Sequence, residues 1–572
     1  MRFVNRALRR FLRSGGVVMA LLGSAVCGTA TAQGTLIVEP ATPFVANAPS
    51  ATLSDPTIQP YLSSGGGAPF SNSIEIPRPG NLPSDILTCH MTPPPNVPAK
   101  VPCRMLRVQA DGSMIDISRQ VFGNGPLPSV TQWSTRPIVG DFNEDGRADI
   151  FLPVQGYDGA YNGVQGTGER NLLLISNPDG TYTDRSATLP QIDDYSHSGC
   201  VGDIDGDGHL DIYVGNFGIW SPYFLMGKGD GTFTQRYEGV PSVVVSRQES
   251  FTSCALADID GDGYPELVLG SIGNANSKGN IVYFNDGKGD FSVRPRLVLP
   301  PNPALPPGAV TPGNYVTLGI LPLDVNHDGR MDLILNSTHY DHGNSIQVLI
   351  NRGDGTLADE SATRLPADTN RVTGHWCTFM NIADFNGDGW EDLYCDTGRL
   401  EPEYPRLWVS NGNGTWNAVR TDSLPPYSVS AQVKAVHFNG DGLPDLVNFC
   451  ADTPNVAYRT NFNRTPHTVP SEPIIGTAVA GIAQATISFL PPLSGGAIPV
   501  TSYTASCRQG SAPGIVKASG ARSPIIVTKL ISGKRYDCSV IANSAAGPSL
   551  PSRPLSVVSL SDNYTALWWN PA

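Results

Sequence analysis

The stretch VGDIDGDGHLDIYVGN, residues 201–216, sets the interpretation of the whole chain. Carboxylates alternate along it, a glycine follows them, and a further aspartate closes a loop between two apolar runs. Side chains at alternate positions converge only where the backbone curls around a centre, and glycine permits the sharp turn that this requires. Calcium accepts about six to eight oxygen ligands in loose geometry, so the loop predicts a calcium site. Its residues are Asp203, Asp205, Asp207, Gly208 and Asp211.

The same loop pattern occurs six times, at intervals of about 53 to 66 residues along the chain. A recurrence of this length is typical of repeat proteins, in which each copy forms one structural unit. The last copy differs from the others, because a histidine stands where the first aspartate is expected. The other five copies are Asp141, Asn143, Asp145 and Asp149; Asp258, Asp260, Asp262 and Glu266; Asp324, Asn326, Asp328 and Asp332; Asp384, Asn386, Asp388 and Asp392; and His437, Asn439, Asp441 and Asp445.

Each repeat carries four short strand-like runs. One apolar run leads into the acidic loop and a second follows it, as at residues 212–214. A third run, such as 223–226, leads through a glycine-rich turn at 229–231 to a fourth. Glycine between two such runs indicates a β-hairpin, and four antiparallel strands per repeat of about 60 residues indicate a blade of a β-propeller. We therefore expect an all-β chain with a β-propeller at residues 84–468.

The number of blades depends on the segment before the first acidic loop. Residues 104–108 and 114–117 match the third and fourth strands of a repeat, and residues 85–87 match a second strand. The first strand of this blade is then expected from residues 456–468, so that both ends of the repeat region share one blade and leave no open sheet edge. This interpretation gives seven blades, and six closed blades are the alternative.

The acidic loops resemble those of FG-GAP repeats, also called VCBS repeats, which are found in integrin α-subunit propellers and in secreted bacterial proteins. The resemblance covers residues 84–468 and implies that each loop binds calcium between the first two strands of a blade. Five loops match the family pattern, so about five calcium ions are expected. His437 departs from it, because a neutral imidazole is a poor calcium ligand. The site that His437 shares with Asn439, Asp441 and Asp445 is expected to be weak.

The first 32 residues have the pattern of a secretory signal peptide. Five arginines flank the start of an apolar run at residues 17–26, and Ala30-Thr31-Ala32 provides a cleavage site. Removing this segment, which holds five arginines and no acid, moves the formal charge from -13 to -18. Such an acidic chain argues against nucleic acid as a partner. No later run is long and apolar enough for a transmembrane segment, so we expect a secreted protein, with the periplasm or the cell surface as alternatives.

The segments on either side of the propeller differ in character. Residues 33–83 are rich in Pro, Gly and Ser and are expected to form an irregular, dispensable leader. Residues 470–558, with landmarks such as Pro491-Pro492, resemble a fibronectin type III domain, which is a β-sandwich. In this resemblance Tyr536 occupies the tyrosine corner. Residues 559–572 are expected to be a tail, either the start of a further module or a docking segment.

Ten cysteines are present, nine of them after the signal peptide, and export permits disulfides. The fibronectin resemblance places Cys507 and Cys538 on neighbouring strands and implies a disulfide between them. A bond between Cys89 and Cys103 is expected to link the second and third strands of the split blade. The other expected pairs are Cys377–Cys395 within one blade and Cys200–Cys254 between adjacent blades, which leaves Cys450 as the odd thiol.

Loops that join second to third strands, and loops between blades, are expected on the face opposite the acidic loops. Aromatic and polar residues gather there and predict a recognition surface, because aromatic rings give a large contact area at low entropic cost. Packing of these side chains under their own loops is the alternative. The candidates are Tyr157, Tyr195, His197, Trp220, His339, Tyr340, His342, His375, Trp376 and Tyr404.

The chain carries no nucleophile elbow, no HExxH motif, no P-loop and no dinucleotide-binding glycine pattern. We therefore expect an extracellular binding or adhesion protein for a glycan or protein ligand rather than an enzyme. The alternative is a secreted polysaccharide lyase or hydrolase, with His339, His342 and His375 near a central channel. Propellers support both classes, so the fold alone does not choose between them.

Overall fold

The computed structural model shows an all-β protein with a few short helices. The predicted signal peptide at residues 1–32 and the predicted tail beyond residue 560 lie outside the described residues. The structure describes residues 50–54, 71–78, 84–90, 100–108, 114–131, 137–156, 160–161, 164–165, 167–217, 220–246, 248–272, 279–302, 315–339, 343–366, 371–372, 377, 380–395, 407–419, 432–437, 442–452, 455–461, 469–496, 498–509 and 514–560.

Among the described residues of 50–461, seven antiparallel sheets have a path of four strands, and they follow one another along the chain. Sheets 1 and 2 are β2 (Ser71–Ile76), β3 (Asp85–His90), β5 (Arg104–Val108) and β6 (Met114–Asp116), then β8 (Ile138–Gly140), β9 (Asp149–Leu152), β12 (Leu172–Ser176) and β13 (Tyr182–Asp184). Sheets 3 and 4 are β14 (Ser196–Gly202), β15 (Asp211–Asn216), β16 (Tyr223–Gly227) and β17 (Phe233–Arg236), then β18 (Phe251–Ala257), β19 (Glu266–Ser271), β20 (Ile281–Tyr283) and β21 (Leu297–Val298).

The remaining sheets keep the same strand order. Sheets 5 and 6 are β22 (Tyr315–Leu323), β23 (Asp332–His339), β24 (Gly343–Asn351) and β25 (Leu357–Asp359), then β27 (Met380–Ala383), β28 (Asp392–Cys395), β29 (Leu407–Ser410) and β30 (Trp416–Val419). Sheet 7 is β31 (Gln432–Val436), β32 (Asp445–Asp452), β33 (Asn455–Asn461) and β1 (Ser50–Ser54). Smaller elements are β4 (Val101–Pro102), β7 (Ser129–Val130), β10 (Ala160–Tyr161), β11 (Val164–Gln165), β26 (Arg371–Val372) and the helices α3 (Ser118–Phe122), η1 (Ser186–Thr188), α4 (Ser242–Val245) and α5 (Ser361–Arg364).

The origin of the first strand of sheet 1 differs from the prediction. The second, third and fourth strands lie where the sequence places them, but the first strand is β2, which pairs with β3 from Ser71–His90 to Ile76–Asp85. Residues 455–461 form β33, the third strand of sheet 7, instead of closing sheet 1. Ile76 of β2 is buried with Leu87 in the core of sheet 1. The β2 strand therefore supplies an apolar side chain to this core, whereas residues 455–461 belong to sheet 7.

Residues 33–83 are therefore not an irregular leader throughout, because both β1 and β2 lie within them. β1 pairs antiparallel with β33, from Ser50–Arg459 to Ser54–Asn455, and becomes the outermost strand of sheet 7. The two ends of the repeat region do share one sheet, as predicted, but the shared sheet is the last one. A strand from the N-terminal part of the chain, β1, therefore completes the last sheet.

Apolar side chains from neighbouring sheets pack together and form the core. Phe151 and Leu173 of sheet 2 meet Ile212 and Leu225 of sheet 3 in one buried cluster. The second and third strands are buried on both faces because a sheet lies on each side of them. The near-continuous apolar runs of these strands, such as the residues of β9, follow from that position.

The first strands of consecutive sheets also lie next to one another. β8 contacts β14, β14 contacts β18, β18 contacts β22 and β22 contacts β27. β31 of the last sheet contacts β2 of the first. The predicted disulfides agree with this order, since Cys200 of β14 is bonded to Cys254 of β18, and Cys89–Cys103 and Cys377–Cys395 lie within sheets 1 and 6. The side chain of Cys450 lies outside the described part of the chain, so its free thiol stays a prediction.

Residues 470–558 form a two-sheet sandwich with a core of its own. One sheet holds β34 (Ile474–Gly481), β35 (Gln484–Leu490) and β38 (Ile525–Thr528). The other holds β36 (Val500–Arg508), β37 (Ile515–Gly520), β39 (Arg535–Ser544), β40 (Gly547–Pro548) and β41 (Leu555–Val558). The Cys507–Cys538 disulfide joins β36 to β39 as predicted. Tyr536 accepts the Ile531 N–H on its hydroxyl at 2.9 Å, which is the bond expected of a tyrosine corner.

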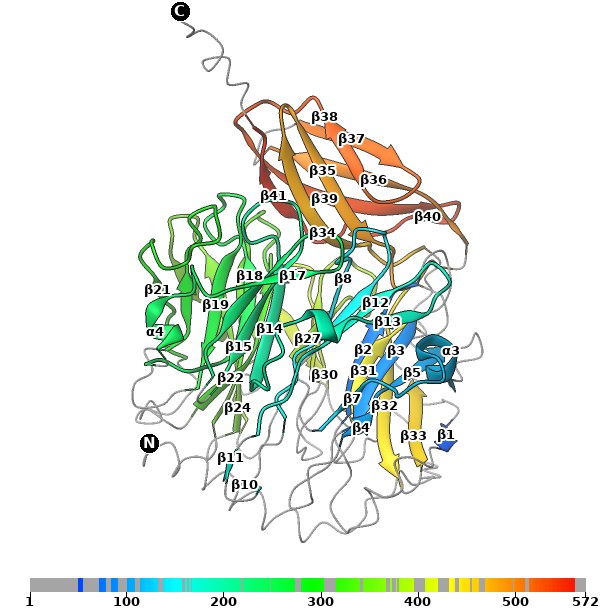
Figure 1. Cartoon of the computed structure of the whole chain (residues 1–572). Helices are drawn as coiled ribbons and strands as arrows, with labels where there is room; N and C mark the ends of the chain where they lie inside the picture. The colour runs from blue at the N-terminus through cyan, green and yellow to red at the C-terminus, as the bar shows by residue number, and fades with distance from the viewer. Residues whose placement is uncertain are drawn as a thin grey trace, which may run out of the picture.

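The sandwich lies against the ends of the repeat sheets, with β34 and β41 turned toward them (Figure 1). The Ser84 hydroxyl donates to the Leu493 carbonyl at 2.6 Å, and Leu490 joins the buried cluster of sheet 1. The contact therefore involves both polar and apolar groups. Within the described residues, no helix is long and apolar enough to cross a membrane.

Candidate functional site

The acidic loops all connect the first strand of a sheet to the second, as predicted. We number them loop 1 (141–149), loop 2 (203–211), loop 3 (258–266), loop 4 (324–332), loop 5 (384–392) and loop 6 (437–445), and number their positions 1 to 9. In loops 1 to 5 the position 1 aspartate accepts the position 6 glycine N–H at 2.8 to 3.1 Å. This bond closes the turn and directs the alternate carboxylates toward one side. The glycine has positive φ in every loop, for example 94° at Gly208.

The position 9 acid has a structural role that the sequence did not reveal. It is fully buried in loops 1 to 5. One carboxylate oxygen accepts the position 2 N–H at 2.6 to 2.9 Å, and the other accepts an N–H from the third strand at 2.7 to 3.5 Å. The acid thus ties the loop to two strands of its sheet. These residues are Asp149, Asp211, Glu266, Asp332 and Asp392.

Burial raises the pKa of these acids, because a charged carboxylate loses its hydration there. The backbone donors oppose the rise without cancelling it, and the pKa is about 8 for Asp211 and Asp392 and about 9 for Glu266. Burial likewise raises the pKa of Asp203 to about 6 and of Asp384 to about 7. The ionised form of these carboxylates is therefore disfavoured by burial, and the nearby hydrogen bonds stabilise it only in part. A bound cation would supply the missing stabilisation.

Oxygen atoms converge most closely in loops 2 and 3. One carboxylate oxygen from each of Asp203, Asp205 and Asp211 lies within 4.8 Å of the others, and the same holds for Asp258, Asp260 and Asp262. The oxygen-only donor set and this spacing fit a hard cation. In loops 1, 4 and 5 an asparagine at position 3 replaces one carboxylate, and in loops 1 and 5 its amide donates to the position 5 aspartate at 2.9 to 3.0 Å.

Neighbouring loops contact one another through the residue at position 7. The His209 ring of loop 2 bonds the Glu144 carboxylate of loop 1. Tyr264 of loop 3 lies against position 4 of loop 2, where a Cβ on Gly206 would come within 2.6 Å of the tyrosine ring. Trp390 of loop 5 stacks on His327 of loop 4, with ring centres 3.7 Å apart. Position 7 varies in type, so the sequence pattern gives no sign of this link.

The Trp390 stack predicts a measurable loss of stability. Changing Trp390→Ala removes the ring contact with His327, and we expect the free energy of unfolding to fall by about 1 kcal/mol or somewhat more. The measurement is denaturant unfolding followed by intrinsic fluorescence and circular dichroism. Trp390→Phe is the matched control and should keep most of the stability. Equal losses in the two variants would contradict the stacking account.

Loop 6 differs from the other loops at position 1, where His437 takes the place of the aspartate. The His437 Nδ1 lies 3.1 Å from a carboxylate oxygen of Glu75, and the His437 backbone N–H donates to Glu75 at 3.0 Å. Burial disfavours the charged imidazole, but the Glu75 carboxylate outweighs it and raises the pKa of His437. The residue at position 1 of loop 6, His437, therefore contacts Glu75 of β2. Asn439 and Asp441 lie outside the described residues.

The sandwich covers the loop-bearing end of the sheets. A Cβ on Gly208 of loop 2 would lie 2.7 Å from Val479, and one on Gly389 of loop 5 would lie 3.3 Å from Leu550. Over loop 3 the nearest group is the guanidinium of Arg535. The acidic loops are therefore an interface between two parts of the chain, which the sequence did not predict.

On the opposite face, three of the predicted recognition residues are described, and they lie together. Tyr195 and Trp220 stack with ring centres 5.6 Å apart, and His197 lies 5.7 Å from the ring of Phe217. Tyr195 is buried, whereas His197 and Trp220 are half-buried. For His339 only the backbone is described, at the end of β23. The other candidates, Tyr157, Tyr340, His342, His375, Trp376 and Tyr404, lie outside the described residues.

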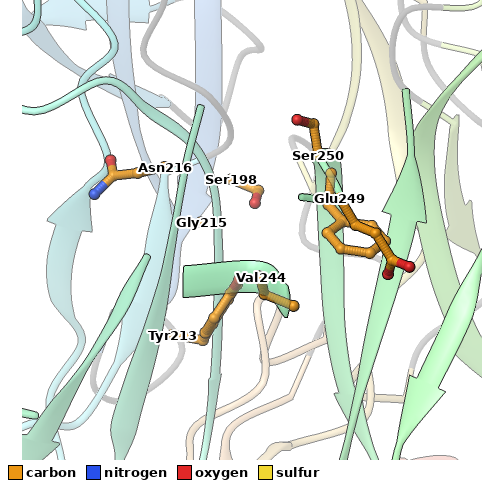
Figure 2. Close-up of a pocket in the computed structure, with 8 residues that line it drawn as sticks. Ser198, Tyr213, Gly215, Asn216, Val244, Glu249 and Ser250 are labelled. Atoms are coloured by element: carbon orange, nitrogen blue, oxygen red, sulfur yellow. The ribbon is translucent and has the colours of Figure 1, made fainter. Parts of the chain in front are cut away.

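A small cavity lies between sheets 3 and 4 (Figure 2). Its volume is about 10 Å³, which is room for about one water molecule. The cavity is too small to be a substrate pocket. Its lining residues are Ser198, Tyr213, Gly215, Asn216, Val244, Glu249, Ser250 and Phe251.

Comparison with known proteins identifies the repeats. Residues 162–214, 258–335 and 324–395 match the family described as FG-GAP-like repeat. These segments include loops 2 to 5 and confirm the predicted repeat class over that part of the chain. The chain therefore contains FG-GAP-like repeats.

Two curated relatives share part of this region. Phosphatidylinositol-glycan-specific phospholipase D of Mus musculus is 26% identical over 196 residues, which are 30% of this chain and 21% of that protein. Cartilage acidic protein 1 of Xenopus tropicalis is 27% identical over 178 residues, which are 31% of this chain and 25% of that protein. The chain thus spans about a quarter or less of the length of these relatives.

Solved structures match over a stretch of about the size of one domain. The FN5 domain of Drosophila Lar is 20% identical and covers 16% of this chain and 99% of that chain, with a TM-score of 0.14. The fibronectin type-III domain of human fibronectin type III domain containing protein 3 is 24% identical and covers 18% of this chain and 94% of that chain, with a TM-score of 0.15.

Proposed function

We propose that this chain is an extracellular calcium-binding protein whose seven sheets form a closed β-propeller and whose face opposite the acidic loops binds a glycan. The ring is supported by contacts between first strands, which run from β8 to β27 and join β31 to β2. The His437–Glu75 pair and the β1–β33 pairing link the last sheet to the start of the repeat region. An extracellular location is supported by four disulfides and by the FG-GAP-like repeats.

Calcium is the cation that the loops suit. Their donors are carboxylate and amide oxygens, and in loop 2 those of positions 1, 3 and 9 converge in a turn held by glycine. In loop 2, no arginine or lysine among the described residues pairs with these carboxylates. Asp203, Asp205 and Asp211, whose oxygens lie together, would hold the ion there, with Asp207 as a further donor of the loop. A bound ion would offset the repulsion between them and make the loop, and the strands it joins, more rigid.

The proposal of a glycan ligand rests on one observation, the aromatic cluster of Tyr195, His197, Phe217 and Trp220. Rings at the edge of a face supply a flat apolar surface on which the apolar side of a sugar can lie. Polar groups lie close by, since the Asn216 amide beside the cluster bonds Asp194 at 3.2 Å. The cluster therefore supports a binding protein.

A glycan-binding experiment tests the assignment. We expect the wild-type chain in calcium to bind a subset of a glycan array, and Trp220→Ala to lose about fivefold or more in affinity, because stacking contacts of this kind are worth about 1 kcal/mol or more. Trp390→Ala, which removes a tryptophan from the loop face, is the matched control and should bind as the wild type does. Equal binding by Trp220→Ala and wild type, or binding only to protein ligands, would overturn the assignment.

A further inference from the structure

Loop 3 differs from the other acidic loops in how many of its carboxylates pair with arginine: in loops 1 and 4 the described ion pair is at position 5, between Asp145 and Arg147 and between Asp328 and Arg330. Arg294 bonds two of its carboxylates, those of Asp260 and Asp262, the second at 3.2 Å. Arg535, which belongs to the sandwich, places its Nη2 3.6 Å from Asp258 Oδ2. The carboxylates at positions 1, 3 and 5 are therefore each paired with a guanidinium. These are the same oxygens that a calcium ion would need.

The position of Arg535 is fixed from the sandwich side. Its guanidinium donates to the Ser556 hydroxyl at 2.6 Å and lies 3.2 Å from Asp537 Oδ1, and the Ser556 hydroxyl in turn donates to Asp537 at 2.8 Å. The side chain also lies directly over the turn of loop 3, where a Cβ on Gly261 would be only 1.9 Å from Nη1. The Arg535 guanidinium is therefore fixed by residues of the sandwich and points into loop 3.

At position 6 the sandwich presents apolar side chains to loops 2, 3 and 5 alike, with Val558 nearest Gly263 of loop 3. Val479 faces Gly208, and Leu550 faces Gly389. Arg553 of the sandwich acts electrostatically on Glu391 at position 8 of loop 5. In loop 3 a sandwich arginine, Arg535, lies instead against the position 1 carboxylate and over the position 4 glycine.

We propose that loop 3 is the docking site of the sandwich, with Arg535 and Arg294 in the place of a calcium ion, so that calcium at this loop and docking through Arg535 exclude each other. The inference rests on the proposed calcium binding by the other loops. A divalent ion among Asp258, Asp260 and Asp262 would lie next to two guanidinium groups and would repel both. Loop 3 then fastens the two domains together, while the remaining loops hold calcium.

Counting bound calcium in the full chain tests the inference. The samples are wild type, Asp203→Asn, Asp258→Asn, Arg535→Gln and Arg522→Gln, each gel-filtered in the same free calcium and analysed for calcium per chain. We expect Asp203→Asn to lose about one ion, Asp258→Asn to lose none and Arg535→Gln to gain about one. Arg522, an exposed arginine of the sandwich with no ion pair among the described residues, is the control and should change nothing.

Small-angle X-ray scattering of the same samples supplies a second readout. Arg535→Gln in calcium should increase the radius of gyration, because the sandwich loses its charged contact, whereas Arg522→Gln should not. Loss of an ion by Asp258→Asn, or no gain by a folded Arg535→Gln, would overturn the inference while leaving the proposed calcium binding intact. If Arg535→Gln does not fold, the Asp258→Asn count decides. A wild-type chain without any calcium would overturn both proposals, because loops lacking an arginine would then be empty too.

Discussion

Removal of calcium is expected to lower the melting temperature by roughly 10 °C or more. Each ion that binds only the folded chain stabilises it by about 2.7 kcal/mol at a hundredfold excess over its dissociation constant. Four occupied loops would then contribute on the order of 10 kcal/mol, which is comparable with the whole stability of a typical domain. The buried carboxylates explain why the effect is large. Without a cation, acids such as Asp203 and Asp384 carry a cost of burial that raises their pKa values to about 6 and about 7.

Differential scanning calorimetry at one scan rate, with chelator and with calcium, measures the effect. Calcium added back should restore the melting temperature, and magnesium should restore it poorly because it requires stricter octahedral geometry. The sandwich provides an internal reference, since its core, built around the Cys507–Cys538 disulfide, contains none of the loops. An unchanged melting temperature in chelator would show that the loops need no ion to hold their shape.

The acidic loops could be predicted because their information is local. Alternating acids, a glycine at position 6 and an acid at position 9 specify a turn without reference to distant residues. The order of strands around each loop followed from the same repeat. The tyrosine corner of Tyr536 and the Cys507–Cys538 disulfide were also predictable, because the fibronectin resemblance implied both, and the other cysteine pairs followed from their places in the repeats. The metal itself stays a prediction for all the loops.

The parts that could not be predicted depend on partners far away in the sequence. β1 and β2 are short segments whose pairing is decided by the strands they meet, so the composition of residues 33–83 concealed them. One signal was present: His437 breaks the loop pattern, and a buried histidine needs a polar partner, which Glu75 of β2 provides. Docking of the sandwich had no such signal, because Arg535 is an ordinary strand residue until the fold brings it over loop 3.

The second large effect concerns the start of the repeat region. A chain beginning at residue 84 lacks both β1 and β2, and we expect it to aggregate instead of folding. Loss of β2 uncovers the edge of β3 and removes Ile76 from the core of sheet 1. It also leaves His437 buried without Glu75, and breaking a buried pair costs about 3 to 5 kcal/mol. Loss of β1 exposes the edge of β33 at the same time, and an open edge is a template for pairing with another chain.

A graded set of chains separates the two strands. The chain that begins at residue 33 keeps both and should behave as the full protein does, and the chain that begins at residue 55 loses only β1 and should fold with reduced stability. Glu75→Ala in the full chain isolates the buried pair, with Glu75→Gln retaining an acceptor for the His437 N–H and the exposed Glu238→Ala as the control. Size-exclusion chromatography with light scattering, and thermal unfolding, give the readouts. A monomeric chain from residue 84 that is as heat-stable as the full protein would show that the sheets close without β1 and β2, and six closed blades would then describe the fold better.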